Sequence, residues 1–259
     1  MTHDAYADDE LAALYDLEHA GYDDDLAMYE GFARRGELPS LELGAGSGRV
    51  ALHLARQGLR VTGIDASLAM LTRATAALDE RTAPNVRLVE ADMRDFDLAG
   101  EKFDLVYCAL GAFEHLLTID DQLATLRCVA RHLAPGGLFV AQLRSLAAVD
   151  WTQEHAPLIV EWTRHDGEGG TVTKLSGLTV SPAAQTTTAH VIFDRAPAGG
   201  GPVRRRSFDV TRRVFGRFEF ELLLRAAGLR LAALYGDCDL SPFDDRSDTM
   251  VAVARQEGP

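Results

Sequence analysis

The sequence predicts an α/β fold, in which a doubly wound, mostly parallel sheet carries an antiparallel β insertion after its fifth strand. The first observation is that short apolar runs alternate with helical patterns between residues 40 and 143. Such runs, bounded by turns, are typical of strands that helices cover on both faces. The second observation is a change of texture over residues 157–215, where Thr, Val and Ile are frequent and Gly-rich turns recur. These segments favour antiparallel strands.

The elements of the main sheet follow from turn and capping residues. Apolar and aromatic residues recur at helical spacing over residues 9–35, and Gly21 divides them into two expected helices. The hydroxyl groups of Ser67 and Thr118 are expected to cap two later helices. The strands are expected at residues 40–43, 60–64, 86–89, 103–108 and 138–143, and then, after the insertion and a helix at 217–227, at 229–234 and 250–254.

The insertion shows the period of half-exposed strands. Val191 and Phe193 alternate with His190 and Asp194, which is the pattern of an antiparallel strand with one polar face. We expect a cofactor-binding domain formed by residues 1–145 and 211–259, and a β-rich insertion at 146–210. Because exposed strand edges must be covered, the insertion is expected to cap the pocket, to pair with another subunit in a homodimer, or to do both. Its four expected strands lie at residues 158–164, 171–180, 185–194 and 203–215.

Composition narrows the classes of partner. The chain has 259 residues, 47% hydrophobic and 25% charged, which is enough for a large core. A net charge of −13 disfavours nucleic acid, since binding to it depends on neutralising phosphates; the basic run 204–206 is expected to be a solvated strand face. No apolar run is long enough for a membrane helix, and the polar N-terminus does not look like a signal peptide, so we expect a cytoplasmic protein. Three scattered cysteines predict neither a disulfide framework nor a metal site.

The candidate ligand-binding residues lie at the ends of the first three expected strands. Gly44–Gly48 form a Gly-rich turn before a helix, where backbone N–H groups can meet a ligand closely. Asp65 ends the next strand and is placed to accept hydrogen bonds from ribose hydroxyls. Asp92 and Met93 follow the third strand and could hold an adenine, although Asp92 could equally be a cap or a loop acid. The spacing Gly-x-Gly-x-Gly, with Arg49 following, does not match the dinucleotide fingerprint.

Five motifs in order resemble the class I S-adenosylmethionine methyltransferases. They are Glu42–Arg49, Gly63–Ser67, Glu90–Phe96, Phe103–Val106 and Leu133–Gly137. The resemblance implies a Rossmann-like sheet, S-adenosylmethionine as cofactor and S-adenosylhomocysteine as product. The insertion and the last strand are similar to the small-molecule N-methyltransferase branch, which includes glycine and amino-sugar N-methyltransferases. The residues expected at the cofactor are Tyr22, Glu42, Gly44, Ala45, Gly46, Gly48, Arg49, Asp65, Ala66, Met70, Asp92, Met93, Cys108 and Ala109.

His115 is the residue expected to act as general base, because an imidazole titrates near working pH and the segment follows the fourth strand. The alternative is a packed, structural histidine. Glu114 is a rival that we expect to be solvated. Tyr15, Arg144 and Trp151 are the candidates for substrate contact, although packing is the more common role of aromatic residues at such positions.

The expected function is methyl transfer to a nitrogen of a small metabolite, with an oxygen as the less favoured acceptor. Two alternatives remain open at this point: a non-catalytic cofactor-binding module, and a methyltransferase acting on a macromolecule. The acidic charge disfavours the latter, and the segment Cys108–Gly111 lacks the Asn-Pro-Pro-aromatic signature of many base-amino methyltransferases.

Arg49 is expected either to pair with the cofactor carboxylate or to lie on the helix surface.

Overall fold

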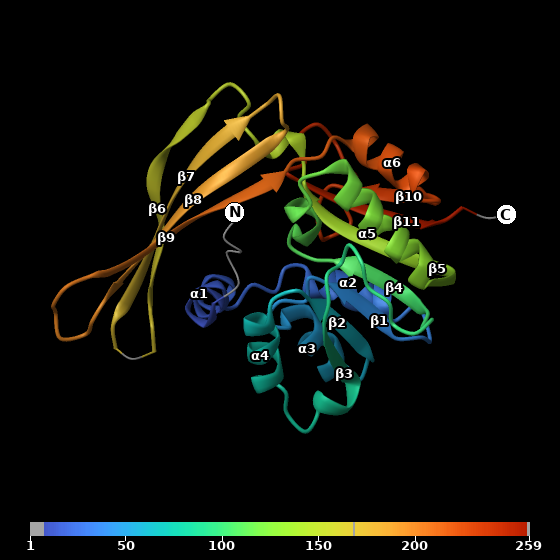
Figure 1. Ribbon diagram of the computed structural model, residues 1–259, viewed down its shortest axis with the longest axis horizontal. Helices are drawn as coiled ribbons and strands as arrows, with labels where there is room; N and C mark the ends of the chain where they lie inside the picture. Colours follow the sequence, from blue (N-terminus) through green and yellow to red (C-terminus); the bar gives the residue numbers. More distant parts are fainter. Residues whose placement is uncertain (1–7, 168, 258–259) are drawn as a thin grey trace. The chain divides into compact units, whose positions relative to one another are not determined.

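The computed structural model describes residues 8–167 and 169–257 (Figure 1). The chain divides into two compact units, one from the ranges Met1–Ala20 and Asp150–Arg213 and the other from Gly21–Val149 and Val214–Pro259. The described helix of residues 9–19 is thus grouped with the antiparallel strands, whereas the sequence ranges had placed it with the main sheet. None of the described helices is long and apolar enough to cross a membrane.

The larger unit is built on a seven-stranded sheet with the order β10-β11-β5-β4-β1-β2-β3. Its pairs are parallel except where β11 runs antiparallel to both of its neighbours. This confirms the predicted doubly wound, mostly parallel sheet. The strands are β1 (Ser40–Leu43), β2 (Val61–Asp65), β3 (Val86–Glu90), β4 (Phe103–Cys108), β5 (Leu133–Arg144), β10 (Leu229–Tyr235) and β11 (Thr249–Gln256).

Helices cover both faces of this sheet. One buried cluster joins it to α5 and α6 through Leu126 and Phe220, and a second joins it to α2 and α3 through Tyr29 and Leu54. The predicted N-caps are confirmed, because the Ser67 hydroxyl accepts from the Met70 amide at 3.2 Å and Thr118 caps α5. The helical elements are α2 (Leu26–Ala33), α3 (Arg49–Arg56), α4 (Leu68–Ala76), α5 (Ile119–His132) and α6 (Arg217–Ala226), with short turns η1 (Ala83–Asn85), η2 (Ala112–His115) and η3 (Leu146–Ala148).

The strand order reverses beside β1. The chain runs outward from β1 to β2 and β3, and then returns to add β4 on the other side of β1. Glu42 of β1 lies directly opposite Tyr107 of β4 in the register. In open α/β sheets the crevice beyond the carboxyl ends of strands at such a reversal is where ligands bind. The Gly-rich turn leaves β1 at this point.

One boundary was predicted incorrectly. The turn at residues 135–137 was expected to precede the fifth strand, but it lies within β5. Leu133 already pairs with Phe103 of β4, and the register then shifts so that Leu138 pairs with Leu105. The glycines therefore form an irregularity inside the strand, with Gly136 at a φ of 82°.

The smaller unit is an antiparallel sheet with the order β6-β7-β8-β9, as predicted for the insertion. Helix α1 (Asp9–His19) packs on it, with Leu11 and Leu14 buried against Phe193. The basic run lies on β9 and is largely exposed, as expected, and its arginines also form ion pairs, among them Arg206 with Asp8 at 2.6 Å. The strands are β6 (His155–His165), β7 (Thr171–Ser181), β8 (Thr186–Ala196) and β9 (Arg204–Arg213).

Candidate active site

The Gly-rich turn adopts a conformation that glycine favours. Gly44, Gly46 and Gly48 have φ values of 70°, 55° and 86°. A Cβ atom on Gly44 would lie 2.9 Å from the Cβ of Ala112 and 3.4 Å from the Cε of Met93. The turn after β1 is therefore packed closely against the segments that follow β3 and β4. Open space beside the backbone of Gly46, where an added Cβ meets nothing within 4 Å, leaves room for a ligand.

Asp65 connects this turn to the next helix. One carboxylate oxygen accepts from the Gly46 amide at 2.7 Å, and the other accepts from the Ser67 amide at 2.8 Å. These two bonds fix the orientation of the carboxylate. Ala66, beside it, is exposed, and Met70 is buried in α4. The structure thus places a carboxylate of fixed orientation at this edge of the sheet, and its contact with a ribose stays a prediction.

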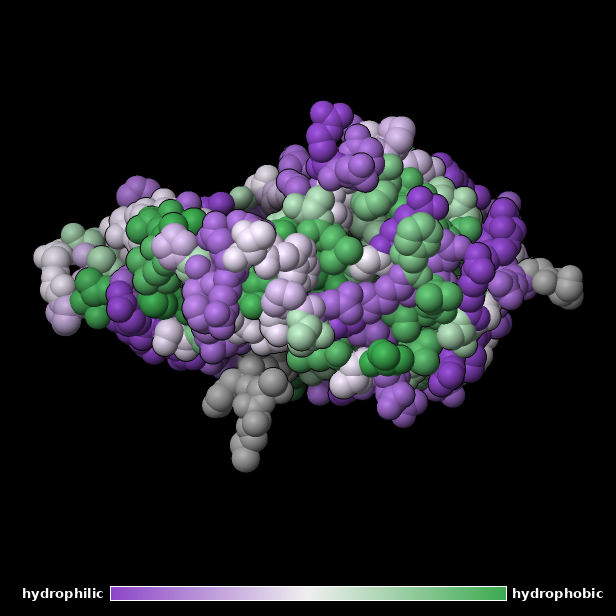
Figure 2. All heavy atoms as spheres, turned by 90° about the horizontal axis from the view of Figure 1, so that it is seen from above, coloured by the Kyte–Doolittle hydropathy of each residue, from purple (hydrophilic) through white to green (hydrophobic). Residues whose placement is uncertain are grey.

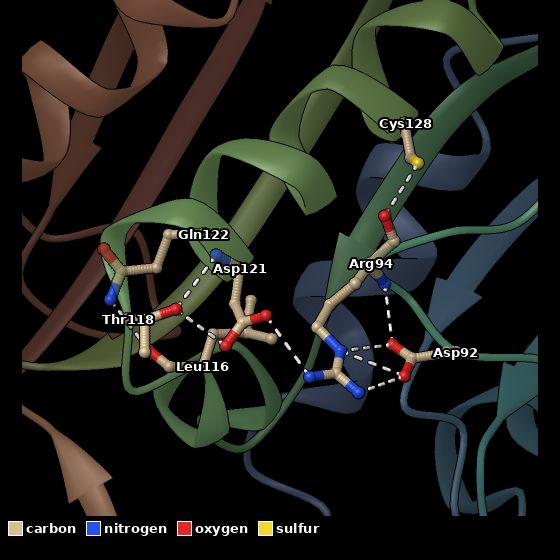
Figure 3. Close-up of polar contacts among 7 residues, drawn as sticks. All are labelled: Asp92, Arg94, Leu116, Thr118, Asp121, Gln122 and Cys128. Carbon is tan, nitrogen blue, oxygen red and sulfur yellow. Dashed lines mark hydrogen bonds and ion pairs between the residues drawn. The ribbon is translucent and has the colours of Figure 1, made fainter.

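Asp92 is held in an ion pair that was not predicted from the sequence (Figure 3). The Arg94 side chain donates to both Asp92 carboxylate oxygens, at 2.5 to 3.0 Å, and the Arg94 amide donates to one of them at 2.9 Å. The side-chain hydrogen bonds of Arg94 hold the pKa of Asp92 below its usual value. Asp92 lies in a loop and caps no helix, and its contact with an adenine stays a prediction. Met93, between them, is half-buried and reaches the Gly44 turn.

The same arginine reaches the start of α5. Its guanidinium donates to Asp121 at 3.2 Å, while Asp121 accepts from the Thr118 hydroxyl at 2.7 Å. Figure 3 shows the chain of contacts from Asp92 through Arg94 to Asp121, with Gln122 directed at the carbonyl of Leu116. The residues after β3 and those that open α5 are therefore connected through polar side chains. The only sequence signal for this link was the position of Arg94 two residues after Asp92.

Several buried or half-buried polar side chains lie next to the Gly-rich turn. Tyr107 donates to the Glu42 carboxyl group at 3.1 Å, and burial raises the pKa of Glu42 to about 8. Beside it, Arg49 forms a bidentate pair with the fully buried Asp25 at 2.6 and 2.7 Å, and its guanidinium lies 5.0 Å from the ring centroid of Tyr22. Arg49 does not lie on the helix surface, because only 17% of its side chain is exposed. Its pairing with a cofactor carboxylate stays a prediction.

The end of β4 is closed to solvent. Cys108 is fully buried, its carbonyl accepts from the Tyr29 hydroxyl at 3.3 Å, and burial raises the pKa of its thiol. Ala45 and Ala109, at the ends of the neighbouring strands, are also buried. Within the described residues no group of three or more His, Cys, Asp or Glu side chains could hold a metal ion. Cys108 has the environment of a small apolar residue.

The segment after β4 carries the two candidate acid–base residues, and one of them is placed differently from expectation. His115 ends η2 and is exposed. Glu114 was expected to be solvated, and this was wrong, since it is only 3% exposed and accepts a hydrogen bond from the Arg144 amide. The reason is local: Gly111 has no side chain, and a Cβ there would lie 2.8 Å from the Glu114 carboxyl carbon. Arg144 itself is half-buried.

The expected substrate residues are divided between the units. Arg144 belongs to the larger unit, as do His115 and all the expected cofactor residues. Tyr15 and Trp151 belong to the smaller unit. The ring of Tyr15 lies 4.1 Å from that of His19 within α1, and Trp151 is half-buried. The structure thus brings the Gly turn, Asp65, Met93 and the segment after β4 together, and leaves the roles of Tyr15 and Trp151 as predictions.

Comparison with known proteins identifies the family of the chain. A family model described as a methyltransferase domain matches residues 41–137. The chain is 30% identical over 235 residues to the dTDP-3-amino-3,4,6-trideoxy-alpha-D-glucopyranose N,N-dimethyltransferase of Streptomyces venezuelae, covering 87% of the chain and 92% of that protein. It is 28% identical to the sugar N-methyltransferase KedS8 from Streptoalloteichus, with a TM-score of 0.71 and coverage of 94% and 93% of the two chains.

A shorter match is more similar in sequence. The dTDP-4-amino-2,3,4,6-tetradeoxy-D-glucose N,N-dimethyltransferase of Saccharopolyspora spinosa is 33% identical over 138 residues, which cover 51% of the chain and 53% of that protein. The chain spans about half the length of this relative and of one further curated relative. The match to the Streptomyces venezuelae protein extends over nearly the full length of both. The chain therefore belongs to the class I S-adenosylmethionine-dependent methyltransferases.

Proposed function

We propose that this protein transfers a methyl group from S-adenosylmethionine to the amino group of an amino sugar or a similar small amine. The observation that carries the proposal is the hydrogen-bonded Asp65, which joins the Gly46 amide to the Ser67 amide at the edge of the sheet. The amino-sugar activities of the Streptomyces venezuelae and Saccharopolyspora spinosa relatives support the acceptor class.

The cofactor residues fall into two groups by the chemistry they offer. Asp65 is proposed to bind the ribose hydroxyls, and Asp92 and Met93 to flank the adenine. Glu42, Arg49 and Tyr22 are proposed to face the amino-acid end, with the Arg49 guanidinium near its carboxylate. When bound, S-adenosylmethionine supplies a methyl group attached to a sulfonium sulfur. The rest of the cofactor leaves as a neutral thioether. The remaining proposed contacts come from Gly44, Ala45, Gly46, Gly48, Ala66, Met70, Cys108 and Ala109.

The protein's task in such a transfer is to orient the acceptor and to receive a proton. Holding the two reacting atoms about 3–3.5 Å apart in line can supply roughly 7–11 kcal/mol of barrier reduction. An ammonium acceptor must lose a proton before its nitrogen can form the new bond. His115, exposed at the end of η2, is proposed to take that proton on its imidazole, and Arg144 to contact the acceptor.

Methyl transfer to a panel of acceptors tests this function. The purified chain would be incubated with S-adenosylmethionine and, separately, a nucleotide-linked amino sugar, a free amino sugar, glycine, a peptide with a free α-amine and a catechol. Mass spectrometry is expected to show one or two added methyl groups on an amino sugar, with little transfer to the catechol. Binding of S-adenosylhomocysteine without transfer to any acceptor would instead favour a non-catalytic module.

The smaller unit supports a proposal about assembly. Strand β6 lies at one edge of its sheet, and it exposes Leu158, Ile159 and Val160 by 52%, 56% and 61%. Hydrophobic residues do reach the surface of this unit (Figure 2, left). Open apolar edges are commonly covered by another chain. We propose that two copies pair through β6 as a homodimer.

Light scattering coupled to gel filtration tests the pairing. Ile159→Lys is expected to shift the protein from dimer to monomer, because it places a charge at the centre of the proposed contact. The matched control is Val203→Lys, which alters an equally exposed residue of the same unit outside β6. A monomeric unaltered protein, or a dimer that persists in the Ile159 variant, would contradict the assignment.

A further inference from the structure

The segment that carries His115 is fixed to the rest of the larger unit at several points. Leu110, at the start of this segment, has a φ of 47°, a left-handed conformation that is unfavourable for a non-glycine residue. The Gln142 side chain accepts from the Leu110 amide at 3.0 Å, and the Gln142 carbonyl accepts from the Gly111 amide at 3.2 Å. The end of β5 therefore holds the start of this segment in a strained conformation.

The two residues on either side of His115 are held as well. Before it, the Glu114 carboxylate accepts from the backbone amide of Arg144 in β5. After it, the carbonyl of Leu116 accepts from the Gln122 side chain at 2.7 Å (Figure 3). Both holding side chains are buried, Glu114 at 3% exposure and Gln122 at 0%. An exposed imidazole thus sits on a backbone that is fixed immediately before and after it.

Because the Glu114 carboxylate is buried, the loss of its hydrogen bonds would cost free energy. A carboxylate that is taken out of water must recover its lost hydration through hydrogen bonds, and a buried group without them is strongly unfavourable. The Arg144 amide is one of its donors. Since Glu114 is next to His115 and its partner amide belongs to Arg144, the contact ties together two residues proposed to face the acceptor. An apolar residue at position 114 could fill the space but could not hold that amide.

We propose that Glu114 is a positioning residue for methyl transfer, which sets His115 and Arg144 relative to each other through the hydrogen bond to the Arg144 amide. The inference rests on the proposed function. Glu114 is not proposed to bind the cofactor or to exchange a proton with the acceptor. Its effect is expected on the turnover of the bound acceptor, and the hydrogen-bond acceptor oxygen, rather than the negative charge, is the group that matters.

Two substitutions separate the hydrogen bond from the charge. Glu114→Gln keeps an oxygen that can accept from the Arg144 amide, whereas Glu114→Ala removes it. We expect Glu114→Ala to lower kcat about tenfold or more, since small misplacements of reacting groups are costly, and to leave the Kd for S-adenosylhomocysteine within about twofold. Glu114→Gln is expected to restore most of kcat. The matched control, Glu101→Ala, removes an exposed glutamate that pairs with Arg87 and should change neither quantity.

Hydrogen exchange gives a readout that does not depend on turnover. The Arg144 amide is expected to exchange faster in Glu114→Ala than in the unaltered chain, and to return toward the original rate in Glu114→Gln. The inference would be overturned if Glu114→Ala kept full kcat, if it weakened cofactor binding as much as turnover, or if Glu114→Gln were as impaired as Glu114→Ala. Absence of transfer by the unaltered chain to every acceptor would be a different result, and would count against the proposed function itself.

Discussion

Asp65 accepts a hydrogen bond from the amide of Gly46 at 2.7 Å, and this contact joins the end of β2 to the Gly-rich turn after β1. The same carboxylate accepts from the Ser67 amide at 2.8 Å, ahead of α4. Neighbouring strands thus present one acceptor group whose orientation is fixed before any ligand arrives. Preorganisation of this kind lowers the entropy lost on binding.

Asp65→Ala is expected to weaken S-adenosylhomocysteine binding at least tenfold, or about 1.4 kcal/mol. The substitution removes the proposed ribose acceptor and also the contact that orients the Gly46 amide. Isothermal titration calorimetry measures the change directly. Glu80→Ala, at an exposed site beyond α4, serves as the control and should bind as the unaltered protein does. Equal affinities for the two variants would remove Asp65 from the site.

His115→Ala is expected to lower turnover on an amine acceptor roughly 100-fold or more, because general bases contribute about that much. Cofactor affinity should not change, since the exposed imidazole is proposed to face the acceptor. Steady-state kinetics and calorimetry on the same preparation separate the two effects. Full turnover by the variant would show that His115 is not the base.

Arg94→Ala is expected to make cofactor binding more sensitive to acid. The side-chain hydrogen bonds of Arg94 lower the pKa of Asp92, so without them Asp92 becomes protonated at a higher pH as the solution is acidified. The fall in S-adenosylhomocysteine affinity on acidification should therefore begin at a higher pH. Arg87→Ala, which breaks the exposed pair with Glu101, provides the comparison. Superimposable pH profiles for the unaltered chain and Arg94→Ala would argue against Asp92 as a ligand.

Glu42→Gln is expected to change how stability depends on pH. Burial raises the pKa of Glu42 from its ordinary value of 4.5 to about 8. The folded state therefore keeps this proton over a range in which the unfolded chain releases it. The associated stability is complete below about pH 4.5 and is lost as the pH rises toward and through about 8.

Denaturant unfolding at about pH 5, 7 and 9 measures how the free energy of unfolding changes with pH. Glu42→Gln carries no titrating group and keeps an oxygen for the Tyr107 hydroxyl, so its free energy of unfolding should fall less steeply with pH. Glu90→Gln, at the end of β3, alters an exposed acid and should keep the original slope. Parallel curves for all three proteins would mean that Glu42 titrates normally.

Much of the fold could be predicted because it depends on local patterns. Apolar runs ending in Gly or Asp gave the strands of the main sheet, and the caps at Ser67 and Thr118 were visible as single hydroxyl residues before helical patterns. The strand boundary at residues 135–137 was missed because glycines usually mark turns, whereas here pairing of Leu133 with Phe103 continues β5 across them.

The site was less predictable where side chains far apart in sequence meet. Nothing in the local sequence indicated that Arg49 would pair with Asp25, or that Glu114 would turn inward to the Arg144 amide. These contacts depend on which strands lie side by side and on how much space a glycine leaves. The buried Gln142 and Gln122, which hold the segment around His115, were missed as holding residues for the same reason.

A co-crystal structure with S-adenosylhomocysteine would show directly whether Asp65 holds the ribose. Both ribose hydroxyls are expected within hydrogen-bond distance of Asp65, with the adenine beside Met93 and the amino-acid end at the turn of Gly44–Gly48. A nucleoside bound elsewhere, or a protein that takes up NAD under the same conditions and not S-adenosylhomocysteine, would contradict it.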